Sequence, residues 1–368
     1  MTKLELLTRK KQLEKDISKY KNLQLAKKVQ LNSAYGALGN QYFRFFDVRM
    51  AESITLSGQL SIRWIEARVN EYLNKLLKTE GEDYVIASDT DSLYITFDRL
   101  VKQVFAKGDG VQNLDTDRVV KFLDDVAEKK IEPFINKSYQ DLADLMNAYD
   151  QKMFMKREAI ADKGIWTAKK RYILNVYDNE GVRYAEPKLK MMGIETVKSS
   201  TPASCRDALK KALAIIMNSD EQSVQKYIAD FREEFRTLPF EDVAFPRSVS
   251  DLTKYQLGGT ELEIGKGTPI HVRGSLVYNH LIKQHKLEKN YERIKDGEKI
   301  KFCYLKEPNP IRQNVLSIIS TLPKQFGLEN YIDYETQFEK SFLEPLNAIL
   351  NVIGWSAEKK ATLEAFFG

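Results

Sequence analysis

Apolar residues recur at helical spacing in two segments near the start of the chain, residues 4–34 and about 51–77. Residues 4–34 contain neither Pro nor Gly, so nothing there interrupts a helix, and we expect this helix to end near the glycines of residues 36–40. A second helix is predicted from about Ala51 to Leu77. The apolar positions behind these two predictions are Leu13, Ile17, Tyr20, Leu23, Leu25, Val29 and Leu31, then Ile54, Leu60, Ile62, Trp64, Ile65, Val69, Tyr72 and Leu73.

β-rich runs on either side of short polar turns predict two hairpins. In the first, residues 84–87 and 92–97 flank the turn Ser88-Asp89-Thr90-Asp91. In the second, residues 171–177 and 182–184 flank a turn at residues 178–181.

The remaining pattern is mostly helical. Residues 117–149 predict helix with an interruption near Pro133, and residues 221–235 and about 330–350 predict further helices. Residues 199–202, Ser-Ser-Thr-Pro, predict a helix start in which a hydroxyl is the N-cap and Pro lies in the first turn, with the helix running to about Met217. Residues 246–310 are rich in Gly, Pro and polar residues, so we expect loops with short strands. The whole favours an α+β fold with a domain boundary near residue 198.

Composition narrows the class of protein. The 368 residues are 43% hydrophobic and carry a net charge of +5, which permits a nucleic-acid partner without requiring one. No run of 18 apolar residues predicts a membrane span. Cys205 and Cys303 are too few for a disulfide framework or a zinc site, which favours a reducing cytoplasm. Residues 1–30 hold nine basic and three acidic residues. This local excess of positive charge indicates either a functional basic surface or an ordinary solvated helix face.

The turn at Asp89 and Asp91 is a candidate metal site. Two carboxylates at positions i and i+2 of a hairpin turn can both approach one divalent cation, and such hard oxygen ligands suit Mg²⁺. The alternative is an ordinary polar turn, because Asp and Thr are common in turns.

Two further motifs suit phosphates. Lys28, Asn32 and Tyr35 fall on one helix face, followed by Gly36, and a cation, an amide and a ring in a row suit a bound nucleotide. The alternative is a Lys stem lying beside a core Tyr. Residues 169–172, Lys-Lys-Arg-Tyr, suit a nucleic-acid backbone or else form a solvated basic turn.

Taken in this order, the three motifs resemble the second half of family B DNA polymerases, of the kind found in T-even-type bacteriophages. The resemblance spans nearly the whole chain. It includes residues 32–40, 43–47, 157–160, 186–190, 198–202 and the C-terminal residues 360–368.

The resemblance implies a right-hand polymerase architecture. Residues 1–40 would be the second fingers helix, and residues 41–197 the palm, with a catalytic hairpin at 84–97 and a basic hairpin at 166–184. Residues 198–368 would be a mostly helical thumb that ends in a clamp-binding tail.

It also implies roles for the motif residues. Lys28 and Asn32 would bind the incoming dNTP, while Tyr35 and Gly36 would pack at the nascent base pair. Asp91 would be the catalytic carboxylate that holds two Mg²⁺ ions, with Asp89 as a supporting ligand. The implied reaction would be in-line attack of the primer 3′-hydroxyl on the α-phosphate of a dNTP, with release of pyrophosphate.

Other residues enter the expected site through the same resemblance. Glu158 would be an auxiliary metal carboxylate, although Lys156 stands where the phage relatives have an acidic residue. The primer–template would be bound by Lys169, Lys170, Arg171 and Tyr172, with His271 and Arg273 as thumb contacts to phosphate. Leu363, Phe366 and Phe367 would dock into a sliding clamp, unless the tail packs on its own thumb.

One departure from the family affects the functional prediction. Family B polymerases carry another essential Asp in an earlier motif, Asp-x-x-Ser-Leu-Tyr-Pro-Ser, and a proofreading exonuclease upstream of it. Here Asp16 is the only Asp before Lys28, and no such motif surrounds it. We therefore expect the C-terminal subunit of a split polymerase, inactive alone, whose N-terminal polymerase and exonuclease chain supplies the missing carboxylate. The alternatives are a non-catalytic DNA-binding or clamp-tethering accessory subunit, and an experimental fragment of a longer polymerase.

Overall fold

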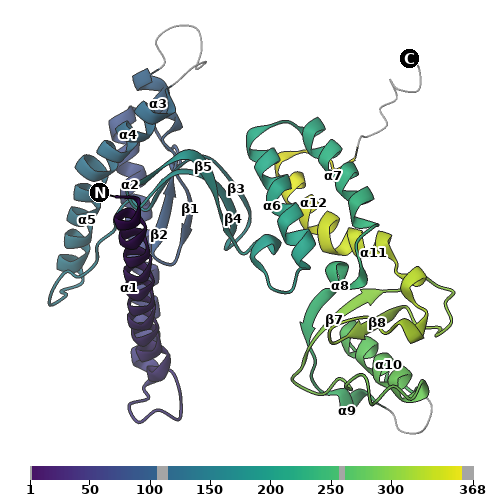
Figure 1. Cartoon of the computed structure of the whole chain (residues 1–368). Helices are drawn as coiled ribbons and strands as arrows, with labels where there is room; N and C mark the ends of the chain where they lie inside the picture. The colour runs from purple at the N-terminus through teal and green to yellow at the C-terminus, as the bar shows by residue number, and fades with distance from the viewer. Residues whose placement is uncertain (1, 106–114, 257–261, 359–368) are drawn as a thin grey trace, which may run out of the picture. The chain divides into compact units, whose positions relative to one another are not determined.

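The computed structural model describes residues 2–105, 115–256 and 262–358 (Figure 1). Its contacts divide the chain into two compact units, Met1–Arg157 and Glu158–Gly368. Helices combine with antiparallel sheets in this chain, so the α+β class is confirmed. The division into fingers, palm and thumb stays a prediction.

Two long helices begin the first unit. Helix α1 spans Lys3–Leu38 and α2 spans Val48–Leu77, close to the predicted bounds. A capping box of Thr2 and Glu5 starts α1, and the Asp47 side chain accepts the Arg49 N–H at the start of α2. None of the residues of α1 is buried, whereas α2 buries one face against the unit's core.

The first predicted hairpin is confirmed, and it packs on α2. Strand β1 (Val85–Asp89) pairs antiparallel with β2 (Ser92–Ile95). Helices α3 (Asp98–Phe105), α4 (Thr116–Val126) and α5 (Glu132–Leu145) follow. The helix at 117–149 is interrupted by a π-helical turn, Ala127–Ile131, just before Pro133, as predicted near that residue. Proline lacks the N–H that an α-helix would bond four residues back, so the preceding turn widens.

The core of the first unit joins one face of α2 to α5 and β1. Ile65, Val69, Leu73 and Leu77 recur every four residues along α2 and are at most 5% exposed. They meet buried residues of the hairpin and of the α5 region, which are Tyr84, Val85, Ile131, Ile135, Tyr139 and Leu142. The hairpin is thereby held on a rigid base.

A three-stranded meander opens the second unit. Strands β3 (Ala159–Ala168), β4 (Arg171–Asn179) and β5 (Val182–Met192) pair in sequence order. The second predicted hairpin is therefore confirmed, but its turn is shorter than the expected 178–181. Only Glu180 and Gly181 form the turn, with φ of 51° and 83°, and two positive φ values suit the twist of a tight hairpin.

Helices and a second three-stranded sheet complete this unit. The sheet has the order β6 (Phe245–Ser248), β7 (Lys299–Tyr304) and β8 (Val315–Ile318). The helices are α6 (Ala203–Asn218), α7 (Glu221–Phe235), α8 (Phe240–Val243), α9 (Leu252–Tyr255), α10 (Ile270–Gln284), α11 (Tyr334–Phe338) and α12 (Glu344–Leu350). One core connects them with β4, β6, β7 and β8.

Two predictions for this unit are wrong. Residues 246–310 are not only loops and strands, because α10 is a buried helix. Its Gly274 lies against β8, where an added Cβ would stand 2.5 Å from Ser317 Oγ, so the glycine that looked like a loop signal serves close packing. At the start of α6, Pro202 itself is the N-cap and no hydroxyl caps the helix.

Candidate functional site

The carboxylate turn joins β1 to β2. Asp89 is the last residue of β1 and is half-buried, while Asp91 in the two-residue turn is exposed. Thr90 Oγ1 donates to Asp89 Oδ1 at 2.9 Å, and the Asp91 N–H donates to the Asp89 carbonyl at 2.6 Å. The first bond orients the Asp89 carboxylate, and the second tightens the backbone of the turn that carries Asp91.

The turn carries backbone strain at Thr90. Its φ of 55° lies in the left-handed region, which β-branched residues avoid at a cost of about 1–2 kcal/mol. Strain of this kind persists where the surroundings over-determine the backbone, and it is frequent at functional sites. Here the hairpin is supported by α2, and Ser88 Oγ donates to Glu66 Oε2 at 3.2 Å.

A buried phenol stands near Asp91. Burial, together with a smaller contribution from the negative charge of Asp91, raises the pKa of Tyr139 to about 12. Tyr139 is 3% exposed in the core under the hairpin. The negative charge of Asp91 is therefore felt in the core under the hairpin, which disfavours ionisation of the Tyr139 phenol there.

The turn supplies two oxygen ligands of the type that Mg²⁺ binds. Within residues 2–105, 115–256 and 262–358, no three His, Cys, Asp or Glu side chains gather to hold a metal ion. A role for Asp89 and Asp91 as metal ligands stays a prediction.

Glu158 belongs to the second unit, whereas Asp91 belongs to the first. Its exposed carboxylate pairs with Lys190 of β5. Lys156, two residues earlier, is exposed. A role for Glu158 as a metal ligand stays a prediction.

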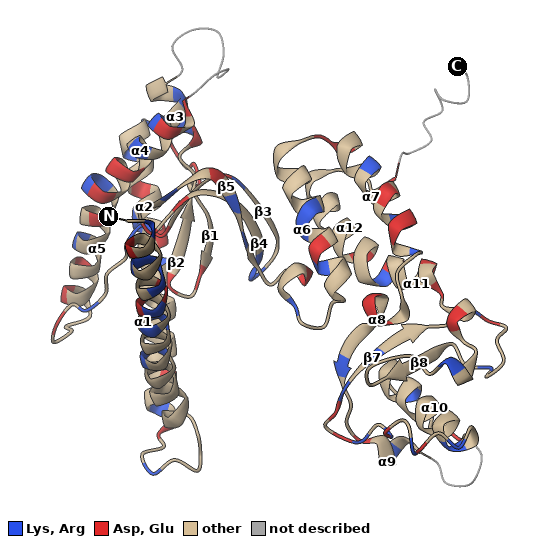
Figure 2. Cartoon of the chain, viewed as in Figure 1, with Lys and Arg blue, Asp and Glu red and all other residues tan. Residues whose placement is uncertain are grey.

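The expected nucleotide-binding residues lie together on the C-terminal part of α1. Lys28, Asn32, Tyr35 and Gly36 are all exposed, and Tyr35 retains 42% of its accessible surface. Lys and Arg residues are spread along the helix (Figure 2). The helix is confirmed, and the role of these residues stays a prediction.

The Lys-Lys-Arg-Tyr segment forms the β3–β4 turn and the start of β4. Lys169 and Lys170 are exposed at the tip, and Lys170 has a φ of 62°. Gly193 approaches this turn so closely that an added Cβ would stand 2.3 Å from the Lys170 carbonyl oxygen. Any larger residue there would displace the turn.

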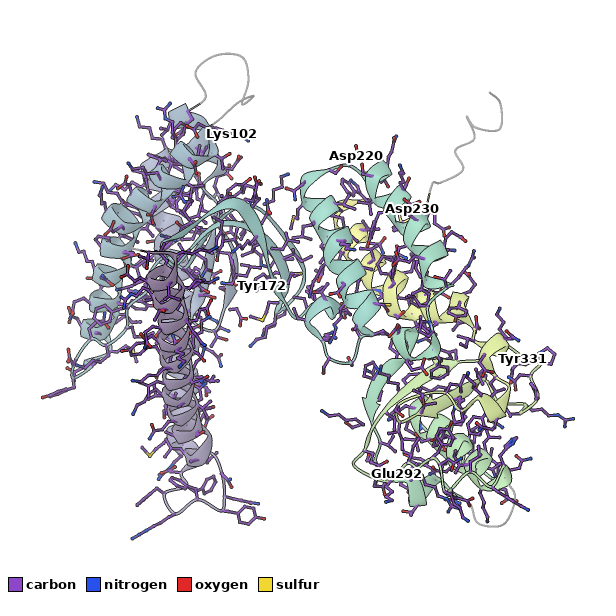
Figure 3. The ribbon with its side chains drawn as sticks, viewed as in Figure 1. Lys102, Tyr172, Asp220, Asp230, Glu292 and Tyr331 are labelled. Carbon is purple, nitrogen blue, oxygen red and sulfur yellow. The ribbon has the colours of Figure 1, made fainter. Side chains whose placement is uncertain are left out.

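The other two residues of that segment point into the unit. An Arg171 guanidinium nitrogen pairs with Glu195 Oε2 at 2.7 Å. Tyr172, labelled in Figure 3, is only 6% exposed and packs near Trp166. The two lysines are therefore the accessible part of the predicted DNA contact.

His271 and Arg273 lie in the first turn of α10. The His271 ring packs beside Phe302, and burial followed by the charge of Arg247 lowers the pKa of His271. An Arg273 guanidinium nitrogen donates to Asn314 Oδ1 at 3.3 Å. Both side chains are half-buried, and their contact with phosphate stays a prediction.

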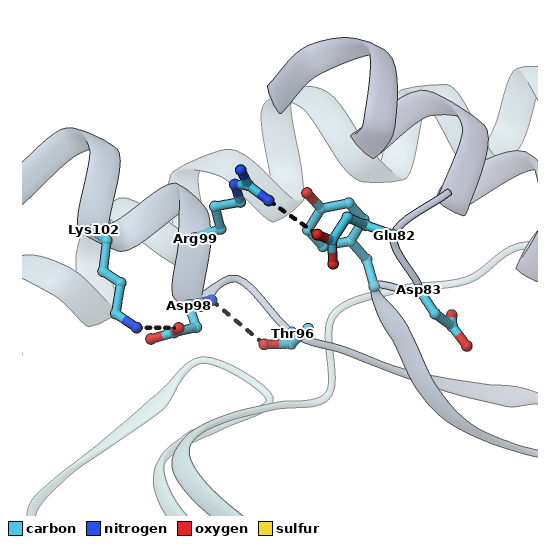
Figure 4. A pocket seen from close by; sticks show the side chains of 7 residues that line it. Glu82, Asp83, Thr96, Asp98, Arg99 and Lys102 are labelled. Carbon is cyan, nitrogen blue, oxygen red and sulfur yellow. Dashed lines mark hydrogen bonds and ion pairs between the residues drawn. The ribbon is translucent and has the colours of Figure 1, made fainter. Parts of the chain in front are cut away.

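One hollow lies in the first unit and another lies in the second. The first, of about 330 Å³, is lined in part by Glu82, Asp98, Arg99 and Lys102, and these charges pair with one another (Figure 4). The second is lined by Arg171 and by several charged residues that sequence reasoning missed, namely Glu195, Lys198, Arg247, Lys340 and Glu344. They are scattered over 150 residues, so no local motif could have indicated them.

Two remaining points concern the expected clamp-binding residues and the search for a membrane-spanning helix. Leu363, Phe366 and Phe367 lie outside the described residues. Over the described ranges, no helix combines the length and apolar character needed to cross a membrane.

Comparisons with known proteins identify the family. The model of DNA polymerase family B matches residues 1–353. The DNA-directed DNA polymerases of Enterobacteria phage T4 and Escherichia phage RB69 are 39% and 41% identical over 357 residues, covering 94% of this chain. DNA polymerase II of Escherichia coli K12 is 40% identical over 75 residues, which is 20% of this chain and 8% of that protein. The chain spans 38% of the length of the two phage relatives. It therefore belongs to DNA polymerase family B, among the T4-like members.

Proposed function

We propose that this chain is the C-terminal part of a DNA-directed DNA polymerase that adds dNTPs to a primer 3′-hydroxyl on a template. The observation that carries the proposal is the strained, core-supported turn that presents Asp89 and Asp91, in a chain whose two phage relatives are named DNA-directed DNA polymerases. The substrates are primer–template DNA and a dNTP.

Asp91 and Asp89 are the residues of this chain that would hold divalent metal, Mg²⁺ in this proposal. Two bound ions would activate the attacking hydroxyl and neutralise the charge that develops on the phosphates. Asp91 is exposed and free to reach a ligand, while Thr90 and the backbone hold Asp89 in place. A carboxylate outside this chain completes the site, and Glu158 is an auxiliary candidate.

The exposed row on α1 would bind the incoming nucleotide. Lys28 neutralises its phosphates, Asn32 bonds to phosphate or sugar oxygens, and Tyr35 with Gly36 packs at the base pair. These side chains are fully available for such contacts because α1 buries none of its residues. Lys169 and Lys170 would bind the DNA backbone, with His271 and Arg273 as further contacts.

A second chain with the N-terminal polymerase and exonuclease parts would complete the enzyme. Two features support this part of the proposal. The family's earlier catalytic Asp motif is missing from these residues, and α1 exposes many large apolar side chains that a partner would cover. Primer extension tests it, with this chain alone, then mixed with the separately produced N-terminal remainder of the phage RB69 polymerase. We expect extension only from the mixture, and extension by this chain alone would contradict the proposal.

The C-terminal residues would tether the enzyme to a sliding clamp through Leu363, Phe366 and Phe367. Deletion of residues 361–368 should shorten products made with the clamp and leave clamp-free synthesis unchanged. The proposed place of action is the host cytoplasm, where the two buried free thiols, Cys205 and Cys303, would stay reduced.

A further inference from the structure

Three polar side chains on one face of α2 hold the strand that leads into the carboxylate turn. Glu66, Asn70 and Asn74 follow one another at four-residue spacing, so the helix places them in a row. All three are half-buried, and each makes a hydrogen bond to the segment between residues 82 and 88. The row therefore runs beside β1 from its base towards the turn.

The last two members of the row bind backbone groups at the base of the strand. Asn74 Nδ2 donates to the Glu82 carbonyl oxygen at 2.7 Å. Asn70 Oδ1 accepts the N–H groups of Tyr84 at 2.8 Å and of Val85 at 3.1 Å. These bonds fix the lead-in and the first residue of β1, but they do not reach the turn.

A β-bulge separates this anchored base from the carboxylates. Before the bulge, Val85 pairs with Ile95, and the register of the hairpin then shifts. After the bulge, Ser88 pairs with Leu93. Cross-strand partners share a face of the sheet, and both Ile95 and Leu93 pack against the core that contains α2. Ser88 therefore faces the helix together with Val85, whereas regular alternation would have placed Asp89 there.

Glu66 holds the strand beyond the bulge. Ser88 Oγ donates to Glu66 Oε2 at 3.2 Å, one residue before Asp89. Glu66 follows Ile65, which is 0% exposed in the core, so packing fixes this part of the helix. A bulge increases the local twist of a strand and re-aims the side chains that follow it. A hydrogen bond from a packed helix to a residue beyond the bulge therefore limits how far the turn can rotate.

We propose that Glu66 is a positioning residue for the carboxylate turn. Acting through Ser88, it keeps Asp89 directed away from α2 and holds the turn that carries Asp91 in one orientation. Glu66 does not itself contact metal or substrate. The inference rests on the proposed polymerase function for its catalytic consequence, whereas the restraint on the hairpin is a property of this chain alone.

The restraint is tested first in the full chain without a partner. Hydrogen exchange of peptides from residues 84–97, followed by mass spectrometry, measures the opening of the hairpin. Glu66→Ala and Ser88→Ala should each speed this exchange by about threefold to tenfold, the range expected for the loss of one hydrogen bond. Glu71→Ala removes a carboxylate from an exposed ion pair with Arg68 on the same helix and is the matched control. Equal exchange in the wild type, Glu66→Ala and Ser88→Ala would overturn the inference, as would equal acceleration by Glu71→Ala.

The catalytic consequence is tested by single-turnover primer extension, with this chain complemented by the N-terminal remainder of the phage RB69 polymerase. The Mg²⁺ concentration is varied, because two misdirected carboxylates should bind the cation less well. Glu66→Ala and Ser88→Ala should each raise the half-saturating Mg²⁺ concentration by about threefold to tenfold. A loss of folded protein would instead lower the rate at every Mg²⁺ concentration and leave the half-saturating value unchanged, which would contradict the inference.

Two further variants separate positioning from direct contact. Glu66→Gln keeps an oxygen that accepts from Ser88, so its half-saturating Mg²⁺ concentration should stay near that of the wild type. The double variant of Glu66→Ala and Ser88→Ala should lose no more than either single variant, because both remove the same hydrogen bond. Equal losses in Glu66→Gln and Glu66→Ala would assign the effect to the charge and contradict the inference, and so would additive losses in the double variant.

Failure of the polymerase proposal gives a different result. The complemented enzyme would then extend no primer even with the wild-type chain. The faster exchange of residues 84–97 in Glu66→Ala and Ser88→Ala would persist, and it would still support the restraint that Glu66 places on the hairpin.

Discussion

Helices α1 and α2 follow each other in the same unit, yet they differ in what holds them. Both begin at a side-chain cap, and both are long, at 36 and 30 residues. Helix α2 buries six residues, including Ile65, Val69 and Leu73 at 0% exposure, whereas α1 buries none. Local signals are therefore enough to define both helices, but only α2 gains stability from a core.

The exposed apolar surface of α1 is large. The residues concerned are Leu4, Leu6, Leu7, Leu13, Ile17, Tyr20, Leu23, Leu25, Val29, Leu31 and Tyr35. Most helical stability in proteins comes from packing rather than propensity, and contiguous apolar patches mark interaction sites. The difference between the helices teaches that the first unit is complete around α2 and open along α1.

The largest expected effect is in amide hydrogen exchange. In the isolated chain, amides of α1 should exchange through openings that cost several kcal/mol less than those of α2 residues 65–77, a rate difference above about 100-fold. Mass spectrometry of peptides from both helices checks this. Protection of α1 should rise when the N-terminal polymerase chain is added. Equal protection of the two helices in the isolated chain would remove the basis of the comparison.

The second prediction compares matched Leu substitutions. Leu73→Ala in α2 should destabilise the first unit by about 2–5 kcal/mol, because it leaves a cavity in the core. Leu23→Ala in α1, where Leu23 is 52% exposed, should cost less than about 0.5 kcal/mol in the isolated chain. Urea unfolding followed by Trp64 fluorescence, with Trp166 and Trp355 replaced by Phe, reports on this unit alone. A cost above about 1 kcal/mol for Leu23→Ala would show that α1 is packed already.

The smallest expected effect is on the pH dependence of the stability of the second unit, where His271 is a partly buried titratable group. His271 has a lowered pKa in the folded chain, chiefly from burial. At pH values between the folded and the unfolded pKa of this imidazole, the unfolded chain therefore binds more protons than the folded chain. Stability is then full above the unfolded value of about 6.5 and falls as the pH drops towards the folded pKa. His271→Gln should flatten this fall in urea midpoints measured between about pH 7.5 and about pH 5.5. An unchanged pH slope would show that His271 does not titrate differently on folding.

Local patterns predicted the elements well where periodicity and turn residues were continuous. The apolar spacing of α2, the polar turn at Asp89 and the helix predicted at residues 221–235, which is α7, all appear near their expected positions. Helix α10 was missed because Gly274 and the polar residues around it resemble a loop, although packing on β8 requires that glycine.

The residues of the candidate sites also fall into those that the sequence could indicate and those that it could not. Asp91, Lys28 and Lys170 lie in local motifs and could be found from the sequence. Arg247 in β6 and Lys340 in the helical turn before α12 could not, because only the fold brings them to the lining of one hollow. Long-range proximity of single charged residues leaves no periodic or spaced pattern to read.

The central claim is that Asp91 supplies part of a catalytic metal site that another chain completes. Single-turnover primer extension by the complemented enzyme tests it with Asp91→Asn beside Asp98→Asn, a nearby exposed carboxylate that pairs with Lys102. The account predicts a loss of about 1000-fold or more for Asp91→Asn, since positioned metal ligands carry much of the barrier reduction, and near wild-type rates for Asp98→Asn. Extension by Asp91→Asn at the rate of Asp98→Asn would contradict it.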